Sequence, residues 1–116
     1  MDIKYSAVEL MSTSDILARY QQLRMNSEKL CLTLTNEDYV VQPTVDVSPP
    51  KWHLAHTTWF FETFILLIYK ANYQLYDPEY NYIFNSYYES VGERVLRTDR
   101  GNLSRPSVND IYSYRK

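Results

Sequence analysis

Apolar residues between positions 15 and 34 recur every three or four residues, which is the spacing of one face of an α-helix. This face carries Ile16, Leu17, Tyr20, Leu23, Ser27, Leu30, Cys31 and Leu34. Ser14 precedes the pattern and can cap the helix, because its hydroxyl accepts a hydrogen bond from an unpaired backbone N–H. We therefore expect a first helix over about residues 15–34, with Cys31 as a small core residue.

A second helix is predicted over about residues 49–69. Ser48-Pro49-Pro50 is a typical helix start, since serine can cap free N–H groups and proline suits the first helical position. The apolar stripe that follows carries Trp52, Ala55, His56, Trp59, Phe60, Thr63 and Leu67, and Phe64, Ile65 and Leu66 widen it. A helix with so broad an apolar surface needs partners on more than one side, as in a helix bundle.

Tyrosine and asparagine dominate residues 71–106, and we expect one long ordered loop there with at most a short helical turn. Ser107 and Asp110 then form a capping box that opens a helix over 107–116. The predicted fold is all-α: one partial bundle domain over 1–116 with two long antiparallel helices, the loop, and the beginning of a third helix. A helix of about nine residues is marginal alone, so this last element is expected to be cut short.

Composition excludes several function classes. Two glycines among 116 residues leave no glycine-rich phosphate loop and little material for tight hairpin turns. A net charge of −2 gives no basic footprint for nucleic acid, and a single cysteine favours a reducing compartment. The apolar stretch 59–69 is too short to span a membrane, and residues 1–15 lack the pattern of a signal peptide. We expect a soluble, cytoplasmic protein.

The only two histidines, His53 and His56, lie three residues apart and therefore about 60° apart around the predicted helix. Two ligands alone do not make a metal site, so a buried histidine with one hydrogen bond is the simpler interpretation of His56. Glu62 lies about 240° from His56, which favours a surface or loop-pairing role over shared coordination. The residues alone assign no catalytic group.

Three ordered segments resemble one known family. The run 46–64, DVSPPKWHLAHTTWFFETF, is similar to the start of the DinB-like domain of ergothioneine-biosynthesis sulfoxide synthases. The segments 80–89, YNYIFNSYYE, and 103–108, LSRPSV, resemble the same family in the same order. The resemblance covers about residues 37–115 and implies a DinB-like helical bundle.

In that family, the N-terminal bundle is followed by a C-terminal domain that resembles formylglycine-generating enzymes. Non-haem iron(II) and dioxygen couple a cysteine-type thiol to the imidazole C2 of trimethylhistidine, giving a sulfoxide. The resemblance places His56 at one of three iron-ligating histidines, whereas His53 stands where relatives can carry aspartate. Arg97 and Arg100 match basic positions that hold the carboxylates of the thiol substrate.

The other two iron ligands belong to a His-x-x-x-His motif, and this sequence contains no such motif. Our leading hypothesis is therefore a fragment of a sulfoxide synthase that has no independent turnover. An alternative is a stand-alone helical module that associates with itself or completes a separately encoded partner, through an exposed face around Trp59 and Phe60. A third is a metal site built from His53 and His56 of two copies.

Overall fold

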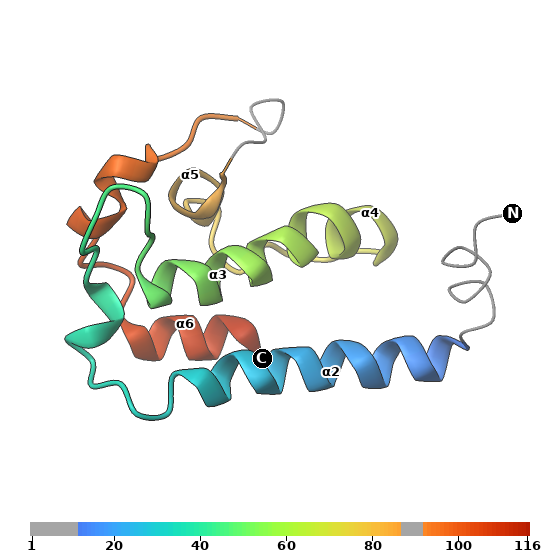
Figure 1. The fold of residues 1–116 in the computed structure, drawn as a ribbon. Coiled ribbons are helices and arrows are strands. Elements are labelled where there is room, and N and C mark those ends of the chain that lie inside the picture. The colour runs from blue at the N-terminus through green and yellow to red at the C-terminus, as the bar shows by residue number, and fades with distance from the viewer. Residues whose placement is uncertain (1–11, 87–91) are drawn as a thin grey trace, which may run out of the picture. The chain divides into compact units, whose positions relative to one another are not determined.

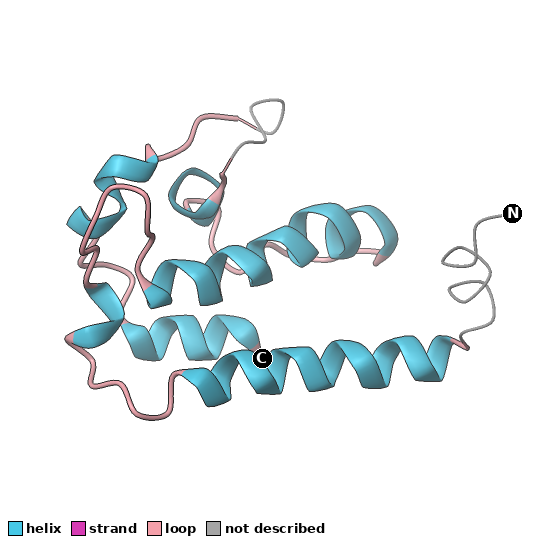
Figure 2. Ribbon diagram, in the orientation of Figure 1, coloured by secondary structure: helices cyan, strands magenta, loops and turns pink. Residues whose placement is uncertain are grey.

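The computed structural model describes residues 12–86 and 92–116, and both ranges are helical or irregular with no strand (Figure 1, Figure 2). The all-α class is therefore confirmed. Residues 87–89, the end of the second segment of the resemblance, and residues 87–91 of the predicted loop lie outside the described residues. Two compact units make up the chain, Met1–Thr33 and Leu34–Lys116.

The first unit contains one long helix, α2, over Thr13–Leu30. Its N-cap is Ser12 and not Ser14: the Ser12 hydroxyl accepts from Asp15 N at 3.1 Å, and Asp15 accepts from Ser12 N in return. The helix also ends four residues before the predicted limit. Backbone bonds from Cys31 and Leu32 tighten to the i→i−3 pattern there, which closes the α-helix. Cys31 is buried, as expected.

The second unit is organised around α3 (Pro50–Phe61), which continues through a π-helical turn, η2 (Glu62–Leu66), into α4 (Leu67–Tyr69). The predicted second helix is thus present over nearly its whole length. Its N-cap is Pro49 and not the predicted Ser48, whose hydroxyl accepts a hydrogen bond from Arg100. The π-helical turn is closed by the bond from Leu67 N to Glu62 O.

Three short elements pack against α3: the 3-10 turn η1 (Asp38–Val40), the helix α5 (Tyr80–Phe84) and the helix α6 (Val108–Arg115). In Figure 1, α3 lies between α5 and α6. The capping box of Ser107 and Asp110 starts α6 as predicted. Where at most one short turn was expected, the described residues of the loop carry two helical segments, α5 and the 3-10 helix η4 (Arg97–Asn102).

Tyrosines from the loop and from α6 complete the core. Buried apolar side chains of the second unit include Tyr39, Trp52, Leu54, Ala55, Trp59, Tyr80, Phe84, Val95, Ile111 and Tyr114. The Tyr80 ring contacts both Phe84 and Tyr114 edge-on, at centroid distances of 5.2 and 4.8 Å. Tyrosine is therefore used here as a packing residue with one polar tip.

Glu62 is buried, with 2% of its surface exposed, so the predicted surface position is wrong while the predicted pairing with the loop is confirmed. One carboxylate oxygen accepts from Tyr73 Oη at 2.6 Å and from Tyr76 N at 3.1 Å. The other accepts from Tyr114 Oη at 2.8 Å. Because three donors satisfy the carboxylate, it joins η2, the loop and α6, and none of these donors within the described residues is a cation.

The predicted exposed face around Trp59 and Phe60 is corrected by the structure. Trp59 is 1% exposed, since its indole N–H donates to Asn81 on α5, and Phe60 is half-buried. Large exposed apolar side chains lie further along the same helix instead: Ile65, Leu67, Ile68 and Tyr69. In the part of the chain that the structure describes, no helix has the length and hydrophobicity to cross a membrane.

Replacing Tyr114 by Phe removes one hydrogen bond to the buried Glu62, and its effect on the free energy of unfolding should depend on pH. Burial of the phenol, and after it the hydrogen bond to Glu62, raises the pKa of Tyr114 far above its ordinary value. The phenol therefore stays protonated at pH 11 in the folded protein. The unfolded phenol ionises above pH 10, which stabilises the unfolded state of the wild type by about 1.4 kcal/mol at pH 11.

At pH 8, Tyr114→Phe should be less stable than the wild type by about 1–3 kcal/mol, because a donor to a buried carboxylate is lost. Urea unfolding at pH 8, 10 and 11 should show this difference shrinking with pH. The exposed Tyr82, replaced by Phe, is the matched control. A difference that stays constant between pH 8 and 11 would contradict the assignment.

Candidate functional site

Three aromatic side chains on one face of α3 bind α5: Trp52 and His56 bind carbonyls at its end, and Trp59 binds the side chain of Asn81. Trp52 Nε1 donates to Ile83 O at 3.2 Å, and His56 Nδ1 lies 2.6 Å from Phe84 O. The spacing of Trp52, His56 and Trp59 places all three rings on the same side of the helix.

The last four carbonyls of α5 all have partners. Asn81 O accepts from Asn85 N, and Tyr82 O accepts from Val95 N. The carbonyls of Ile83 and Phe84, which a helix end leaves without intrahelical donors, are bound by the α3 rings described above. A five-residue helix is thereby held in place by side chains of α3.

The contact with Phe84 fixes the tautomer of His56. A backbone carbonyl only accepts hydrogen bonds, so Nδ1 must carry the proton and Nε2 keeps a lone pair in the neutral ring. The imidazole stacks on Trp52 at 4.5 Å and 9° and on Trp59 at 5.5 Å and 21°. This is the arrangement of a metal-binding histidine, whose second nitrogen donates to a carbonyl.

The surroundings of His56 favour its neutral form. Burial lowers the pKa of His56, and the charges of Arg100 and His53 act in the same direction, against the hydrogen bond to Phe84, which raises it. His53 is exposed and contacts Trp52 edge-on at 5.4 Å. Among the residues that the structure describes, no group of three or more His, Cys, Asp or Glu could hold a metal ion. His56 alone is therefore not a complete coordination sphere in the described part of the chain.

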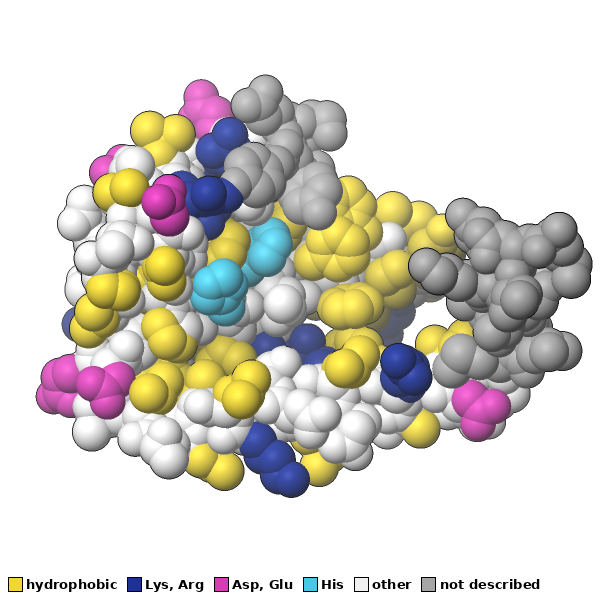
Figure 3. All heavy atoms as spheres, in the orientation of Figure 1, with side chains coloured by type: hydrophobic (Ala, Val, Ile, Leu, Met, Phe, Trp, Pro, Cys, Tyr) yellow, Lys and Arg dark blue, Asp and Glu magenta, His cyan; other side chains and the backbone are white. Residues whose placement is uncertain are grey.

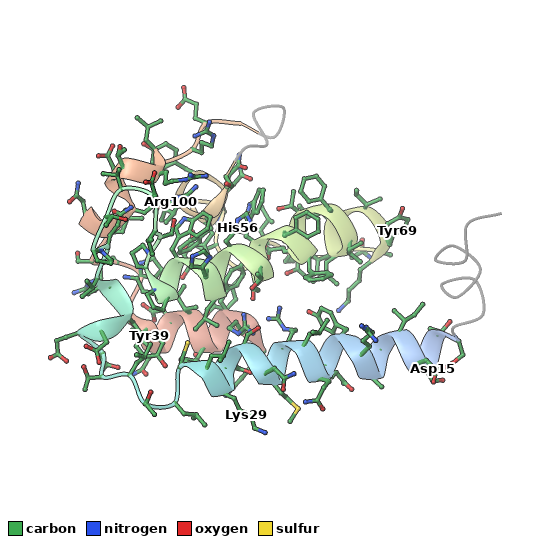
Figure 4. The ribbon with its side chains drawn as sticks, in the orientation of Figure 1. Asp15, Lys29, Tyr39, His56, Tyr69 and Arg100 are labelled. Atoms are coloured by element: carbon green, nitrogen blue, oxygen red, sulfur yellow. The ribbon has the colours of Figure 1, made fainter. Side chains whose placement is uncertain are left out.

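Arg100 is the second notable group, and Figure 4 shows it near His56. Both side chains lie against the indole of Trp52. The Arg100 side chain is 4% exposed, and its Cζ lies 3.6 Å from the centroid of Trp52. Nη1 donates to Ser48 Oγ at 2.8 Å and Nη2 to Ser86 Oγ at 3.4 Å, whereas Nε is buried with no hydrogen-bond partner among the described residues. The hydrogen-bond partners of this buried cation are thus neutral hydroxyls.

Basic groups gather around Arg100. Burial, together with the charges of Arg97 and Arg94, lowers the pKa of Arg100 to about 10. Arg97 lies three residues earlier in η4, and residues three apart in a 3-10 helix share one side. Figure 3 shows both histidines at the surface beside basic side chains. Such a concentration of positive charge favours an anionic ligand.

The resemblance singled out His56, Arg97 and Arg100, and the structure brings two of them, His56 and Arg100, against one shared ring, that of Trp52. Sequence reasoning missed Ser48 and Ser86, because serine hydroxyls that bind a distant arginine leave no local pattern. The spacing of four between Trp52 and His56 was a usable signal for their stacking.

Lys51 was missed as well. It is 3% exposed and donates from Nζ to Leu103 O at 2.9 Å and to Ser104 O at 3.4 Å, and burial lowers its pKa. Lys51 thus fixes the segment between η4 and α6 to the beginning of α3.

The tautomer of His56 can be measured directly by imidazole nitrogen NMR at pH 7. We expect a neutral ring with Nδ1 protonated and Nε2 unprotonated, and a pKa below the ordinary value of 6.5. His53→Gln, at the exposed neighbour, assigns the signals and should leave the tautomer unchanged. A charged His56 ring at pH 7, or a proton on Nε2 alone, would refute this geometry.

The comparisons with known proteins agree with this architecture. The profile of the DinB superfamily matches residues 19–115. A search among curated proteins found no match.

Proposed function

The chain belongs to the DinB superfamily, and we propose that it is the part of an ergothioneine-type sulfoxide synthase that supplies one iron ligand and the thiol-binding arginines. The proposed reaction class is oxygen-dependent C–S bond formation between a cysteine-type thiol and trimethylhistidine. Support comes from the three ordered segments that resemble these enzymes, 46–64, 80–89 and 103–108. It also comes from one feature of the site.

In that feature, the imidazole of His56 and the buried guanidinium of Arg100 both contact the indole of Trp52. His56 stacks on the indole with Nε2 unprotonated, and Arg100 lies over the indole with its Nε unpartnered. A small molecule with both a thiol and a carboxylate suits this pair, since imidazole sites bind iron and guanidinium groups bind carboxylates. Cysteine and γ-glutamylcysteine both have this chemistry.

The residues of this chain then have separate tasks. When bound, ferrous iron supplies the activation of dioxygen that the reaction class requires. His56 would hold it through Nε2, while Trp52 and Trp59 fix the plane of the imidazole and cover it with apolar surface. Arg100 and Arg97 would orient the carboxylates of the thiol substrate.

The chain is not proposed to turn over substrate alone. An oxygen-activating iron site of this class uses three protein ligands, and the sequence holds only two histidines, of which His53 stands at a position that is not a ligand in the resemblance. The His-x-x-x-His pair would have to come from residues outside this sequence. The proposed contribution is therefore half of a composite site.

A second candidate function rests on a different observation. The exposed side chains of Ile65, Leu67, Ile68 and Tyr69 form an apolar surface at the end of the α3–α4 helix, and such surfaces often mediate association. A helical interaction module that self-associates would explain them. Light scattering should then give a mass above 13.9 kDa that falls in Ile68→Asp. A monomer mass for the wild type at high concentration would refute this candidate.

The iron-ligand role can be tested with cobalt(II) chloride as a paramagnetic probe in NMR. Cobalt should broaden the signals of His56 and Phe84 in the wild type. His56→Asn retains an N–H that can donate to Phe84 O but lacks Nε2, so the fold should persist while the broadening disappears. His53→Asn is the matched control and should keep the broadening. Equal broadening in His56→Asn and in the wild type would refute the ligand role.

The arginine role needs its own titration, with γ-glutamylcysteine and with cysteine. Both thiols should shift the side-chain signals of Arg100 and Arg97, and Arg97→Gln should weaken binding about tenfold through the loss of a charged hydrogen bond. Arg19→Gln, in α2 of the other unit, is the control. No shift at either arginine with millimolar thiol would overturn the substrate assignment.

A further inference from the structure

We propose that Gln42 is a positioning residue that holds the arginine-bearing helix η4 in its binding geometry. This inference rests on the proposed function, because it concerns the same anion-binding arginines. Gln42 lies between η1 and α3 in sequence, 55 residues before Arg97. Nothing in its local sequence pattern marks it.

The side-chain amide of Gln42 is inserted into the backbone of η4. Gln42 Nε2 donates to Arg97 O at 2.7 Å, and Gly101 N donates to Gln42 Oε1 at 2.6 Å. In an α-helix these two backbone groups, four residues apart, would bond to each other. Here the carboxamide, which has the same donor and acceptor as a peptide group, bridges them.

Gly101 makes this insertion possible. A Cβ atom built on Gly101 would lie 2.8 Å from both Cβ and Oε1 of Gln42, closer than real Cβ contacts come. One of the two glycines in the sequence is thus required here for space. The glutamine and the glycine together form one close contact.

The contact lies next to the residue that matters for ligand binding. Arg100 immediately precedes Gly101, and its guanidinium must reach Ser48 and Trp52 across the unit. Among the described residues, no side chain caps the N-terminus of η4, and its first turn has a backbone bond from Asp99 N to Leu96 O at 2.9 Å. Gln42 therefore fixes both ends of the stretch Arg97–Gly101.

Gln42 acts through backbone atoms of η4 and donates to no group of the arginine side chains. Its effect on a ligand would therefore be indirect. Glutamate at this position could accept from Gly101 N but would place a carboxylate oxygen against Arg97 O, so that one of the two bonds is replaced by repulsion. Methionine has a similar shape and makes neither bond.

The experiment measures two properties in the wild type, Gln42→Glu and Gln42→Met. The first is the NMR shift of the Arg100 Nε–H, which the Trp52 ring current displaces because the guanidinium lies 3.6 Å from the ring centroid. The second is the affinity for γ-glutamylcysteine. Gln74→Glu makes the same chemical change at an exposed position of the same unit and serves as the control.

We expect both Gln42 variants to move the Arg100 Nε–H towards the shift of an exposed arginine and to weaken γ-glutamylcysteine binding about tenfold. The His56 signals, which depend on α3 and α5, should stay unchanged, and this separates positioning of η4 from general unfolding. Unchanged Arg100 signals in both variants, or a loss of His56 signals together with those of Arg100, would overturn the proposal.

The two measurements also distinguish a failure of the proposed function from a failure of the role assigned to Gln42. If the wild type binds no γ-glutamylcysteine but both Gln42 variants still displace the Arg100 signal, the role of Gln42 in positioning η4 is supported and the substrate assignment is wrong. If the wild type binds the thiol and the variants bind it equally well, the substrate assignment holds and Gln42 is not a positioning residue.

Discussion

The hydrogen bond between His56 Nδ1 and Phe84 O is the constraint on which the site depends. It satisfies the last carbonyl of α5, and it also decides which nitrogen of the imidazole keeps a lone pair. The same hydrogen bond therefore orients the proposed metal ligand and caps the end of α5. Trp52 strengthens this coupling, because its indole stacks on His56 while its N–H binds the neighbouring carbonyl of Ile83.

Buried charges in the second unit are satisfied by neutral groups. Glu62 accepts from two phenols and a backbone N–H, Lys51 donates to carbonyls, and Arg100 donates to hydroxyls. A carboxylate paired with Arg100 would cancel its charge, whereas the two serine hydroxyls accept from Nη1 and Nη2 and leave the positive charge in place. The contacts of Glu62 therefore connect helical segments, whereas the positive charge of Arg100 suits the anionic ligand proposed above.

Local signals predicted much of the fold. Pro49 and Pro50 marked the start of α3, and the capping box of Ser107 and Asp110 marked the start of α6, because both act through neighbouring backbone atoms. The limits of α2 were less predictable. Ser12 and Ser14 are both suitable caps, and only the reciprocal bond with Asp15 selects the first. The prediction of an exposed face around Trp59 was wrong because α5 covers this residue. The sequence alone does not show which later segment packs against α3.

By itself, the sequence determined the helical class and the starts of α3 and α6, and its resemblance to a known family singled out His56, Arg97 and Arg100. Periodicity and caps operate over three or four residues, so they are visible in a linear pattern. Only the tertiary structure decided that Ser48 binds Arg100 and that Gln42 enters the backbone of η4. These contacts join residues more than 50 positions apart, and their energy depends on distances that only the folded chain defines.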